Sequence, residues 1–463
     1  MVRVSTATTM EGAVTENRRT YDIIIFGASG FTGKYVIREA LKHLSVPNSP
    51  LKTIALAGRS KSKISAALQW AAYPSAPPSI PIIQADVLSR SSLISLCRQT
   101  HVILNCVGPY RLYGEPVVSV CVESGTDYLD ITGEPEFIER MEMDYHTKAV
   151  EAGCLMVSAC GFDSIPAEIG VIFNSRQWKG MSAPNRINAY LELKSEKEGM
   201  VGNIGTLESA VLGMANSKNL QEFRRSRPRR AYPVIPGSLP KQALIDYQKD
   251  IGVWGVKLPS ADATVVRRTL SVLIENPKGL VGDKETKEDS IRRERFWSTV
   301  KPVHFSLKLG SKHLINTLQH VFIGTVFLLF TSFSFGRWLI MKYPQTFTFG
   351  CFKKTGPTEE AVNGSSFKMW FVGEGYSDVA LASQTVSNLD TQIVTSISGP
   401  EVGYVTTPII LVQCALIMLA DRPRLPKGGV YPPGVVFGPT DLQKRLHDNG
   451  IFFDFISKKT LFP

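Results

Sequence analysis

Three glycines near the start of the chain have the spacing of a phosphate-binding turn. Gly27, Gly30 and Gly33 follow an apolar run, YDIIIF, and precede a segment with helical periodicity. Glycine permits a tight turn and lets the backbone approach a diphosphate, and the following helix offers unpaired N–H groups and its positive dipole end. We expect this turn to bind a dinucleotide, although a purely structural turn would use the same residues. Its predicted cofactor-binding residues are Gly27, Ser29, Gly30, Phe31, Thr32 and Gly33.

The end of the second predicted strand indicates which dinucleotide is bound. An acidic residue there would hydrogen-bond the ribose 2′-OH of NAD. The chain instead has Arg59 and Ser60, followed by Lys61 and Lys63. These residues suit a 2′-phosphate, so we expect NADP, with NAD as the alternative. A solvated basic turn would have the same sequence.

Two further strand ends contribute residues to the same predicted site. Ligands of parallel sheets lie beyond the carboxyl ends of the strands. An acid after the third strand could reach the adenine, and a glycine after the fourth allows backbone close to the nicotinamide ribose. The residues assigned to the cofactor on this basis are Asp86, Asn105, Val107, Gly108 and Pro109. Ordinary turn chemistry would account for each of them taken alone.

The residues that would supply acid–base catalysis are less distinct. Tyr110 and Asp163 are the polar candidates, and Asp163 would alternatively cap the helix that Pro166 opens. The nearest match to the Tyr-x-x-x-Lys pair of short-chain dehydrogenases is residues 145–148, where the spacing is wrong. CxxC, HExxH and GxSxG are absent, so we expect no metal site and no nucleophilic serine. Hydride transfer is the cofactor's own chemistry, so a reductase is not excluded.

The elements that position these residues alternate between strand and helix over the first 170 residues. Strands are predicted from short apolar runs at 21–26, 53–57, 80–84, 102–106, 128–131 and 154–159. Such nearly continuous runs are typical of strands buried on both faces. Thr32 is expected to cap a first helix, and Pro116 and Pro135 to open two further helices. The pattern predicts an α/β fold with an N-terminal Rossmann domain, built on a doubly wound parallel sheet.

The second half of the chain has a different pattern. Alternating residues predict strands at 186–193, 367–373 and 391–398, the last two as antiparallel neighbours. Residues 205–214 are predicted to be helical, and the almost wholly apolar 408–419 a buried helix. We expect four regions: a disordered tail (1–20), the NADP-binding Rossmann domain (21–170), an inserted α+β substrate or dimerisation domain (171–400) and a return to the first domain (401–463).

One apolar segment, residues 314–341, departs from the pattern of a soluble protein. Its centre, VFIGTVFLLFTSFSFG at 321–336, carries no charge. A membrane span needs about 20 apolar residues, and this centre reaches only about 24 Å as a helix. Basic residues flank it on both sides, at Lys308, Lys312, Arg337 and Lys342. We favour a segment attached to a membrane or lipid-droplet surface. A span, and a buried core or dimer helix, stay open as alternatives.

Composition limits the classes of protein that the chain can represent. It has 463 residues, a net charge of +11 and 43% hydrophobic residues, which excludes a disordered or fibrous chain. Seven cysteines without close pairing indicate a reducing compartment. The first 20 residues lack the apolar core of a secretory signal, and Glu11 and Glu16 weaken a mitochondrial interpretation. We expect a cytoplasmic protein that is not secreted.

The excess positive charge is concentrated in a cluster of arginines at 224, 225, 227, 229 and 230. Basic residues near an apolar segment would assist binding to an anionic lipid surface. The interleaved aromatic residues of a nucleic-acid site are missing, so we expect no nucleic-acid partner.

Taken together, several motifs resemble those of the eukaryotic saccharopine dehydrogenase-like oxidoreductases. They are FGASGFTG (26–33), LAGRS (56–60), LNCVGPYRLYGEPVV (104–118), DITGEPEF (130–137), GFDSIPAEIG (161–170) and GPEVGYVTTPI (399–409). The resemblance covers nearly the whole chain, and bacterial trans-acting enoyl reductases are similar at a greater distance. It implies a Rossmann domain, an inserted α/β domain, a nicotinamide cofactor and association with lipid droplets or membranes.

The resemblance leaves the substrate open. True saccharopine dehydrogenases handle a highly polar amino-acid adduct, for which an apolar anchor has no use. We therefore expect a lipid or lipid-like carbonyl or enoyl substrate, reduced at a lipid droplet or the cytosolic face of a membrane. The alternative is a non-catalytic adaptor that binds NADP(H) at a lipid surface. A homodimer is also open.

Overall fold

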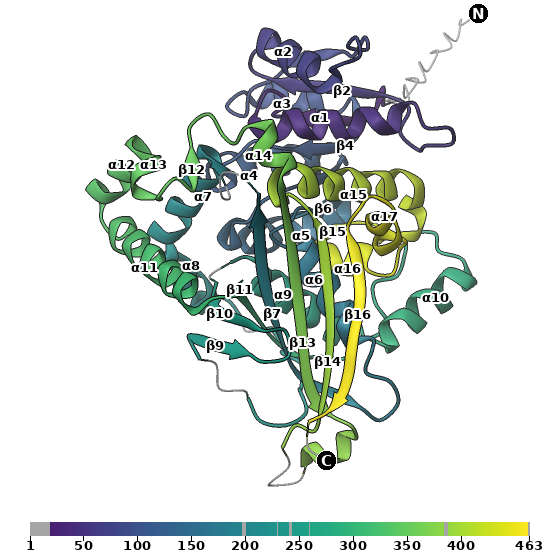
Figure 1. Ribbon diagram of the computed structural model, residues 1–463. Helices are drawn as coiled ribbons and strands as arrows, with labels where there is room; N and C mark the ends of the chain where they lie inside the picture. Colours follow the sequence, from purple (N-terminus) through teal and green to yellow (C-terminus); the bar gives the residue numbers. More distant parts are fainter. Residues whose placement is uncertain are drawn as a thin grey trace, which may run out of the picture.

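The computed structural model describes residues 19–196, 201–228, 230–239, 243–258, 260–383 and 388–461. Residues 1–18 of the tail that we expected to be disordered, and Arg229 of the arginine cluster, lie outside the described residues. Two seven-stranded sheets organise the rest of the chain, one above the other in Figure 1.

The first sheet has seven parallel strands in the order β15-β6-β5-β4-β1-β2-β3. This is the doubly wound arrangement that the sequence predicts. Strand β1, which pairs with β4 on one side and β2 on the other, is buried on both faces, because Ile23, Ile24 and Ile25 are all fully inaccessible to solvent. The strands are β1 (Tyr21–Phe26), β2 (Ile54–Gly58), β3 (Ile82–Gln84), β4 (Thr100–Asn105), β5 (Asp127–Asp130), β6 (Leu155–Val157) and β15 (Gly429–Tyr431).

Helices follow these strands, as expected for parallel neighbours. They are α1 (Phe31–Leu44), α2 (Lys61–Ala72), α3 (Arg90–Cys97), α4 (Tyr110–Glu123), α5 (Pro135–Ala152) and α6 (Ile165–Ser175). The predicted start of α5 at Pro135 is confirmed, and Gly153 ends the helix with a left-handed φ of 67°. Thr32 does not cap α1, because the helix already begins at Phe31 with Gly30 as its N-cap.

Helix α4 begins earlier than the predicted start at Pro116. It starts at Tyr110, and Pro116 lies inside it. The reason is a cap that comes from another segment: the two carboxylate oxygens of Glu134 accept hydrogen bonds from the N–H groups of Tyr110 (2.9 Å) and Arg111 (2.8 Å). A sequence pattern based on local capping residues misses such a partner.

The second sheet is mixed, in the order β16-β14-β13-β7-β11-β10-β9. The predicted antiparallel neighbours are confirmed as β13 and β14, whereas β7 and β11 run parallel. A small parallel pair, β8 (Gly202–Asn203) and β12 (Phe352–Lys353), lies apart from both sheets. The strands of the second sheet are β7 (Ala183–Ser195), β9 (Ile245–Gln248), β10 (Val253–Lys257), β11 (His304–Ser311), β13 (Ser365–Tyr376), β14 (Thr391–Pro400) and β16 (Phe452–Thr460).

Helix α6 joins the two sheets. It follows β6 of the first sheet and packs on β13 and β14 of the second. Its Gly170 lies so close to the Phe371 ring that a Cβ there would come within 2.1 Å of a ring carbon. Asn174 donates hydrogen bonds to the carbonyls of Phe371 and Ile393 and to the Thr395 hydroxyl. The second sheet is therefore held against the end of the first.

The C-terminal residues contribute to both sheets. The predicted buried helix is α15 (Thr407–Asp421), which follows a π-helical turn (Val402–Thr406) and packs on α1 and β4. Strand β15 then extends the first sheet. After α16 (Pro433–Phe437) and α17 (Leu442–Asp448), the chain returns to the second sheet, where β16 pairs with β14.

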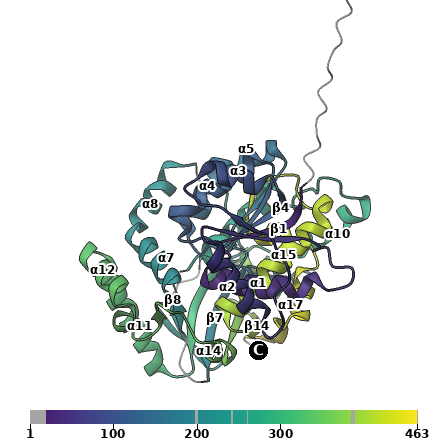
Figure 2. The ribbon, with the colours of Figure 1, turned by 90° about the horizontal axis from the view of Figure 1, so that it is seen from above.

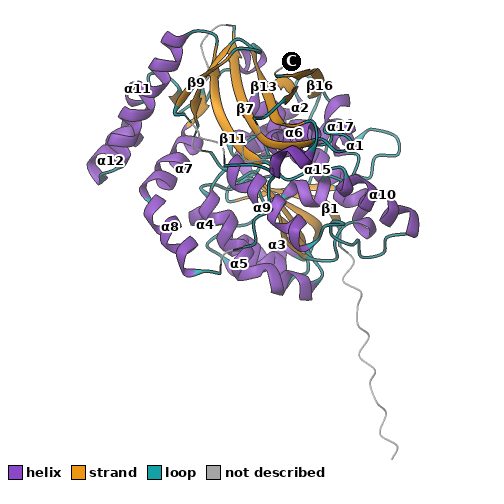
Figure 3. Cartoon of the chain, turned by 90° about the horizontal axis from the view of Figure 1, so that it is seen from below, coloured by secondary structure: helices purple, strands orange, loops and turns teal. Residues whose placement is uncertain are grey.

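The remaining helices surround the second sheet and its junction with the first (Figure 3). Two of them, α11 and α12, form what we call the apolar arm, residues 314–342, which lies at the rim of the molecule in Figures 1 and 2. The helices are α7 (Ile204–Ala215), α8 (Ser217–Ser226), α9 (Asp262–Glu275), α10 (Lys287–Ser298), α11 (Leu314–Thr331), α12 (Ser334–Lys342), α13 (Pro344–Phe347) and α14 (Glu359–Asn363).

Candidate cofactor site and its surroundings

The predicted glycine turn lies between β1 and α1. Gly27 has a φ of 85°, which favours glycine, and its N–H donates to the Ala57 carbonyl of β2 (3.0 Å). A Cβ on Gly33 would come within 2.3 Å of the Gly27 carbonyl oxygen. Ser29 and Gly30 are exposed, and α1 has no side-chain cap. The first-turn N–H groups of Phe31, Thr32 and Gly33 are therefore free to face an anion.

The turn is covered on one side by aromatic rings from distant parts of the chain. The Phe31 ring meets Tyr404 edge-on, with centroids 4.8 Å apart. Gly356 packs on the same ring, because a Cβ there would come within 2.5 Å of it. The sequence assigned Phe31 to the cofactor turn but did not show that the second half of the chain packs against it.

Arg59 and Ser60 follow β2, as predicted for a 2′-phosphate site. Ser60 is the N-cap of α2 and accepts a hydrogen bond from the Lys63 N–H (3.4 Å). Arg59 is exposed, and its guanidinium has no ion-pair partner within the described part of the chain. The guanidinium is thus available to a phosphate beside the positive end of α2.

The ends of β3 and β4 differ in how much they offer a ligand. Asp86 is half-buried, and its Oδ1 accepts a hydrogen bond from the Leu88 N–H (3.0 Å), which leaves Oδ2 for a ligand. Asn105 is fully buried and shapes the turn instead, because its Oδ1 accepts from the Val107 N–H (3.0 Å). Gly108 is exposed, whereas Pro109 is buried as the N-cap of α4. At the end of β4, the Val107–Gly108 backbone is therefore the part open to a cofactor.

A buried polar network lies beneath this edge of the sheet. Asp130 accepts hydrogen bonds from the hydroxyls of Tyr128 and Ser158 and from the N–H groups of Thr132 and Ala159, at 2.8 to 3.0 Å. Burial raises the pKa of Asp130 from 3.8 to about 6, although these donors oppose the shift. The network holds the ends of β5 and β6 together, and the sequence did not reveal it.

Tyr110, one of the two predicted catalytic residues, belongs to this network. Its hydroxyl is buried and donates to the Asn105 carbonyl (2.8 Å). Burial raises the pKa of the phenol well above its usual value. A phenol that is enclosed and hydrogen-bonded to the backbone is suited to positioning the β4 turn rather than to donating a proton to a substrate.

Asp163, the other predicted catalytic residue, reaches the open edge. It lies in the turn before α6, and its side chain makes no cap of that helix, contrary to the capping alternative. One carboxylate oxygen lies against Gly133, where a Cβ would be 2.8 Å away. Asp163 is exposed to solvent on one side, but protein atoms crowd its other sides, and this desolvation raises the pKa of its carboxyl.

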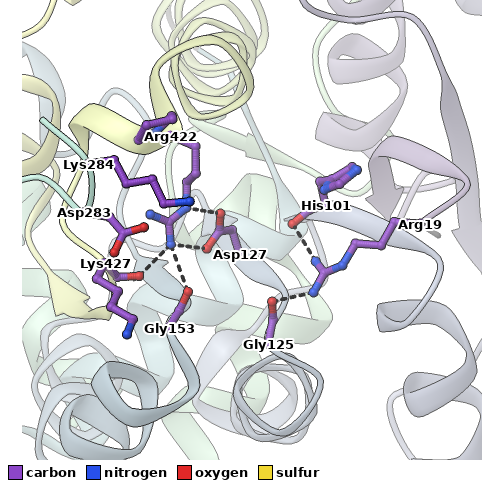
Figure 4. Close-up of a pocket in the computed structure, with 10 residues that line it drawn as sticks. Arg19, His101, Gly125, Asp127, Gly153, Asp283, Lys284, Arg422 and Lys427 are labelled. Atoms are coloured by element: carbon purple, nitrogen blue, oxygen red, sulfur yellow. Dashed lines mark hydrogen bonds and ion pairs between the residues drawn. The ribbon is translucent and has the colours of Figure 1, made fainter. Parts of the chain in front are cut away.

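A cavity at the opposite edge of the sheet contains none of the predicted cofactor residues. It has a volume of about 340 Å³ and includes His101 and Asp127, which stand at the amino ends of β4 and β5 (Figure 4). Arg422 donates to the Asp127 carboxylate (2.7 Å) and to the Gly153 carbonyl (3.1 Å), and Arg19 donates to the Gly125 carbonyl (2.5 Å). These arginines tie together helix and strand ends at the edge opposite the glycine turn. The described residues contain no cluster of three or more His, Cys, Asp or Glu side chains that could hold a metal.

Most of the described arginines of the cluster pair with carboxylates of the protein, which leaves fewer basic residues to assist binding to a lipid surface. Arg224 donates to the buried Glu139 of α5 (2.9 Å), and Arg227 pairs with the same carboxylate. Glu142, one turn further along α5, pairs with Arg230 and Arg268. Most of these arginines therefore form ion pairs that join α8 and α9 to α5, a helix of the first sheet. Lys308, expected to flank the apolar segment, is likewise buried and paired with Asp246.

The apolar arm, by contrast, is open. Two described helical segments are long and apolar enough to cross a membrane. Only 11% of the residues of Leu314–Thr331 are buried, against 78% of the most apolar 18 residues within Val402–Arg424, the segment that contains α15. The buried-core alternative for the arm therefore does not hold within this chain. The arm bends after Thr331, and Gly336 of α12 packs against the Phe330 carbonyl of α11. Its exposed side chains include Ile315, Leu318, Phe322, Leu329, Phe335 and Trp338.

The parallel sheet, the glycine turn and the basic end of β2 define an NADP-binding Rossmann protein. Residues 23–157 match the family model described as the saccharopine dehydrogenase NADP-binding domain. A protein of Arabidopsis thaliana, named "Probable mitochondrial saccharopine dehydrogenase-like oxidoreductase", is 58% identical over 95% of this chain and 97% of its own. The chain belongs to the saccharopine dehydrogenase-like oxidoreductases, and its cofactor is NADP.

More distant relatives extend the comparison. A "Lipid droplet localized protein" of Caenorhabditis elegans is 30% identical over 95% of this chain and 99% of its own. A Mycobacterium tuberculosis protein that carries the name of a trans-acting enoyl reductase is 27% identical over 95% and 98%. The fold is shared with saccharopine dehydrogenase (L-Glu forming) of Saccharomyces cerevisiae, at a TM-score of 0.52 and 12% identity over 95% of this chain and 100% of that one.

Proposed function

We propose that this oxidoreductase reduces a carbonyl or enoyl group of a lipid-like substrate with NADPH, at the surface of a lipid droplet or the cytosolic face of a membrane. The observation that supports this proposal is the exposure of the apolar arm, whose helix α11 has only 11% of its residues buried on an otherwise well-packed chain. Large exposed apolar patches mark interaction surfaces. The name of the Caenorhabditis elegans relative agrees with a lipid surface.

The shape of the arm favours insertion into one leaflet. Helix α11 has 18 residues, which corresponds to about 27 Å and falls short of the roughly 30 Å of a hydrocarbon core even when the helix stands upright. The chain then turns at Ser332–Phe333 into α12 instead of continuing across. Trp338 and Lys342 lie on the second helix, with the Lys342 ammonium 4.4 Å from the Trp338 ring centroid. An aromatic ring beside a cation is typical of the headgroup region.

The arm is also connected to the cofactor edge. Leu207 and Val211 of α7 pack on Ile340 of α12. On the same helix, the Ser209 hydroxyl donates to Glu134 (2.8 Å), the residue that caps α4 beside the β4 turn. Helix α7 thus spans from the arm to the candidate site, which supports a substrate drawn from the lipid surface.

We assign the cofactor as follows. The first turn of α1 and the glycine turn would hold the diphosphate, and Arg59 with the start of α2 would hold the 2′-phosphate. Asp86 would face the adenine, and the Val107–Gly108 backbone the nicotinamide ribose. NADPH, when bound there, supplies the hydride.

Two measurements test the proposal. The purified chain with NADPH is assayed against saccharopine and against a panel of acyl and isoprenoid carbonyl and enoyl compounds, and we expect turnover in the lipid panel. Turnover of saccharopine alone would contradict the lipid assignment. Binding of NADPH without turnover of any compound would favour the adaptor alternative.

The surface assignment is tested separately by flotation with artificial lipid droplets and liposomes. Phe322→Glu and Leu329→Glu, both at positions 61% exposed, should abolish flotation without lowering the melting temperature. Val281→Glu, at a position 65% exposed away from the arm, is the matched control and should float like the parent protein. Equal flotation of all three variants would exclude the arm as the anchor.

A further inference from the structure

Ala159, which follows β6, has a backbone conformation that alanine rarely adopts. Its φ is 66°, in the left-handed region where a Cβ is disfavoured and glycine is not. The residue is buried and packs with Ile138 and Val265, so this conformation is fixed within the core of the protein. Residues other than glycine keep such a conformation only where surrounding groups hold them in it, and they are concentrated at ligand-binding and active sites.

The residue that holds Ala159 is Asp130, the last residue of β5. Its Oδ1 accepts a hydrogen bond from the Ala159 N–H (2.8 Å), and its backbone carbonyl accepts one from the Cys160 N–H (2.7 Å). The Asp130 side chain is fully buried, and all four of the donors to its carboxylate are neutral groups. Burying a carboxylate without a counter-charge is costly, and only donors that stay in place offset that cost. The carboxylate and the turn at Ala159 therefore fix each other.

The turn at Ala159 directs the next residues, 160–163, back toward the end of β5. The Phe162 N–H donates to the hydroxyl of Thr407 (3.1 Å), the first residue of α15. A carboxylate oxygen of Asp163 then lies against Gly133 in the turn after β5. Residues 160–163 therefore run from the end of β6 to the end of β5, at the carboxyl edge of the sheet where ligands of such folds bind.

The strand order relates this segment to one half of the cofactor. The order β3-β2-β1-β4-β5-β6 is that of a dinucleotide fold built from two halves, each of which binds one nucleotide. The 2′-phosphate of the adenine nucleotide is assigned to Arg59, which follows β2. The ends of β4, β5 and β6 are then left to the nicotinamide nucleotide.

We propose that Asp130 is a positioning residue for the nicotinamide half of NADP(H). By holding Ala159 in the left-handed conformation, it sets residues 160–163 against the nicotinamide nucleotide. Asp130 itself is enclosed beneath the segment and acts only through it. This inference rests on the cofactor placement given with the proposed function, but not on the lipid substrate, so it is tested without a substrate.

The test compares NADPH with adenosine 2′,5′-bisphosphate, which has the adenine nucleotide but no nicotinamide. Both ligands are titrated into the full chain by calorimetry. Asp130→Ala removes the acceptor of the Ala159 N–H and should weaken NADPH binding about tenfold or more, while the affinity for the bisphosphate stays unchanged. Arg59→Ala is the control and should weaken both ligands, because both carry the 2′-phosphate. Equal losses for the two ligands in Asp130→Ala would overturn the inference, whereas no loss for either ligand in Arg59→Ala would contradict the cofactor placement.

Further substitutions separate the conformation of Ala159 from general damage to the fold. Asp130→Asn keeps an oxygen for the Ala159 N–H, because the hydroxyl donors can reverse to accept from the amide, so NADPH affinity should stay within about threefold of the parent value. Adding Ala159→Gly to Asp130→Ala should restore NADPH affinity in part, because glycine adopts the left-handed conformation readily. Asn48→Gly, in the loop between α1 and β2, replaces another left-handed residue (φ 61°) and is the matched control that should restore nothing.

Hydrogen exchange of the parent protein tests the inference even if Asp130→Ala does not fold. NADPH should slow exchange of the amides in residues 160–164 more than the bisphosphate does, because only NADPH carries the nicotinamide nucleotide. Equal protection of this segment by the two ligands would overturn the inference. Equal NADPH affinities of the two double variants, Asp130→Ala with Ala159→Gly and Asp130→Ala with Asn48→Gly, would overturn it as well.

Discussion

At the scale of single residues, Arg59 is the side chain expected to select NADPH over NADH. Arg59→Ala should weaken NADPH binding about tenfold to a hundredfold, because a charge-assisted contact with phosphate contributes about 1.5–3 kcal/mol. Binding of NADH, which lacks the 2′-phosphate, should change little. Fluorescence titration with both cofactors measures this difference. Arg98→Ala, at an exposed position after α3, is the control. Equal losses for both cofactors would contradict the role of Arg59.

Glu168 gives a residue-scale prediction about stability. It is buried and accepts hydrogen bonds from the Gly434 N–H (2.7 Å) and the Thr269 hydroxyl. Burial raises the pKa of Glu168 from 4.5 to about 7. The unfolded chain therefore loses this proton at a lower pH than the folded chain does. The contribution of Glu168 to stability is complete below pH 4.5 and is lost as the pH rises to about 7, by about 3 kcal/mol.

Glu168→Gln should remove this pH dependence, because the amide does not ionise and the Thr269 hydroxyl can reverse to accept from it. Urea unfolding between pH 4.5 and 8 measures the effect. Glu151→Gln, at an exposed position, should retain the slope of the parent protein. If Glu168→Gln keeps the full pH dependence of the free energy of unfolding, groups other than Glu168 cause that dependence.

At the scale of elements, the start of α4 depends on a partner from the next strand–helix unit. In Glu134→Gln, the remaining carbonyl oxygen still accepts from one of the two N–H groups, those of Tyr110 and Arg111. The amide NH₂ group then faces the other N–H, which loses its acceptor. We expect a loss of about 1–2 kcal/mol in the free energy of unfolding. NADPH affinity should also fall, because α4 carries the Val107–Gly108 turn at its start.

Ser209→Ala separates this cap from the contact with α7. The substitution removes only the hydroxyl that donates to Glu134, so its effect on stability should be smaller than that of Glu134→Gln. Thermal unfolding and NADPH titration of the two variants provide the comparison. An effect of Ser209→Ala as large as that of Glu134→Gln would mean that α7, rather than the cap, holds the turn.

At the scale of the whole molecule, the ion pairs on α5 hold the second half of the chain against the first. Arg224→Gln removes one of two partners of the buried Glu139 and should cost about 2 kcal/mol of stability. Arg225→Gln removes the same charge from an exposed position one residue away and should cost little. Chemical unfolding of both variants tests this difference.

Arg225→Gln also tests whether exposed basic residues contribute to binding at a lipid surface. If exposed basic residues assist binding to anionic liposomes, Arg225→Gln should weaken flotation by roughly the effect of one surface charge, about 1 kcal/mol.

The stability comparison has its own contradicting outcome. If Arg225→Gln destabilised the fold as much as Arg224→Gln, the assignment of Arg224 to the joint between the two halves would be contradicted.

Local patterns were sufficient for much of this protein. The buried strands, the glycine turn, the basic end of β2 and the antiparallel pair β13–β14 follow from apolar periodicity and turn chemistry over about ten residues. The start of α4 did not follow, because its cap comes from Glu134, 24 residues after Tyr110. Tyr110 and Asp163 were equivalent candidates in the sequence, and they separate only when burial encloses one and leaves the other open.

The sequence by itself determined the doubly wound sheet, the NADP-type turn and the presence of an apolar segment, since each depends on neighbouring residues. Only the tertiary structure decided what the charges and the apolar segment do. It placed Arg224 and Arg227 on the buried Glu139 and left the arm uncovered. Such pairings depend on how two sheets pack through α6, and no local pattern of residues records that packing.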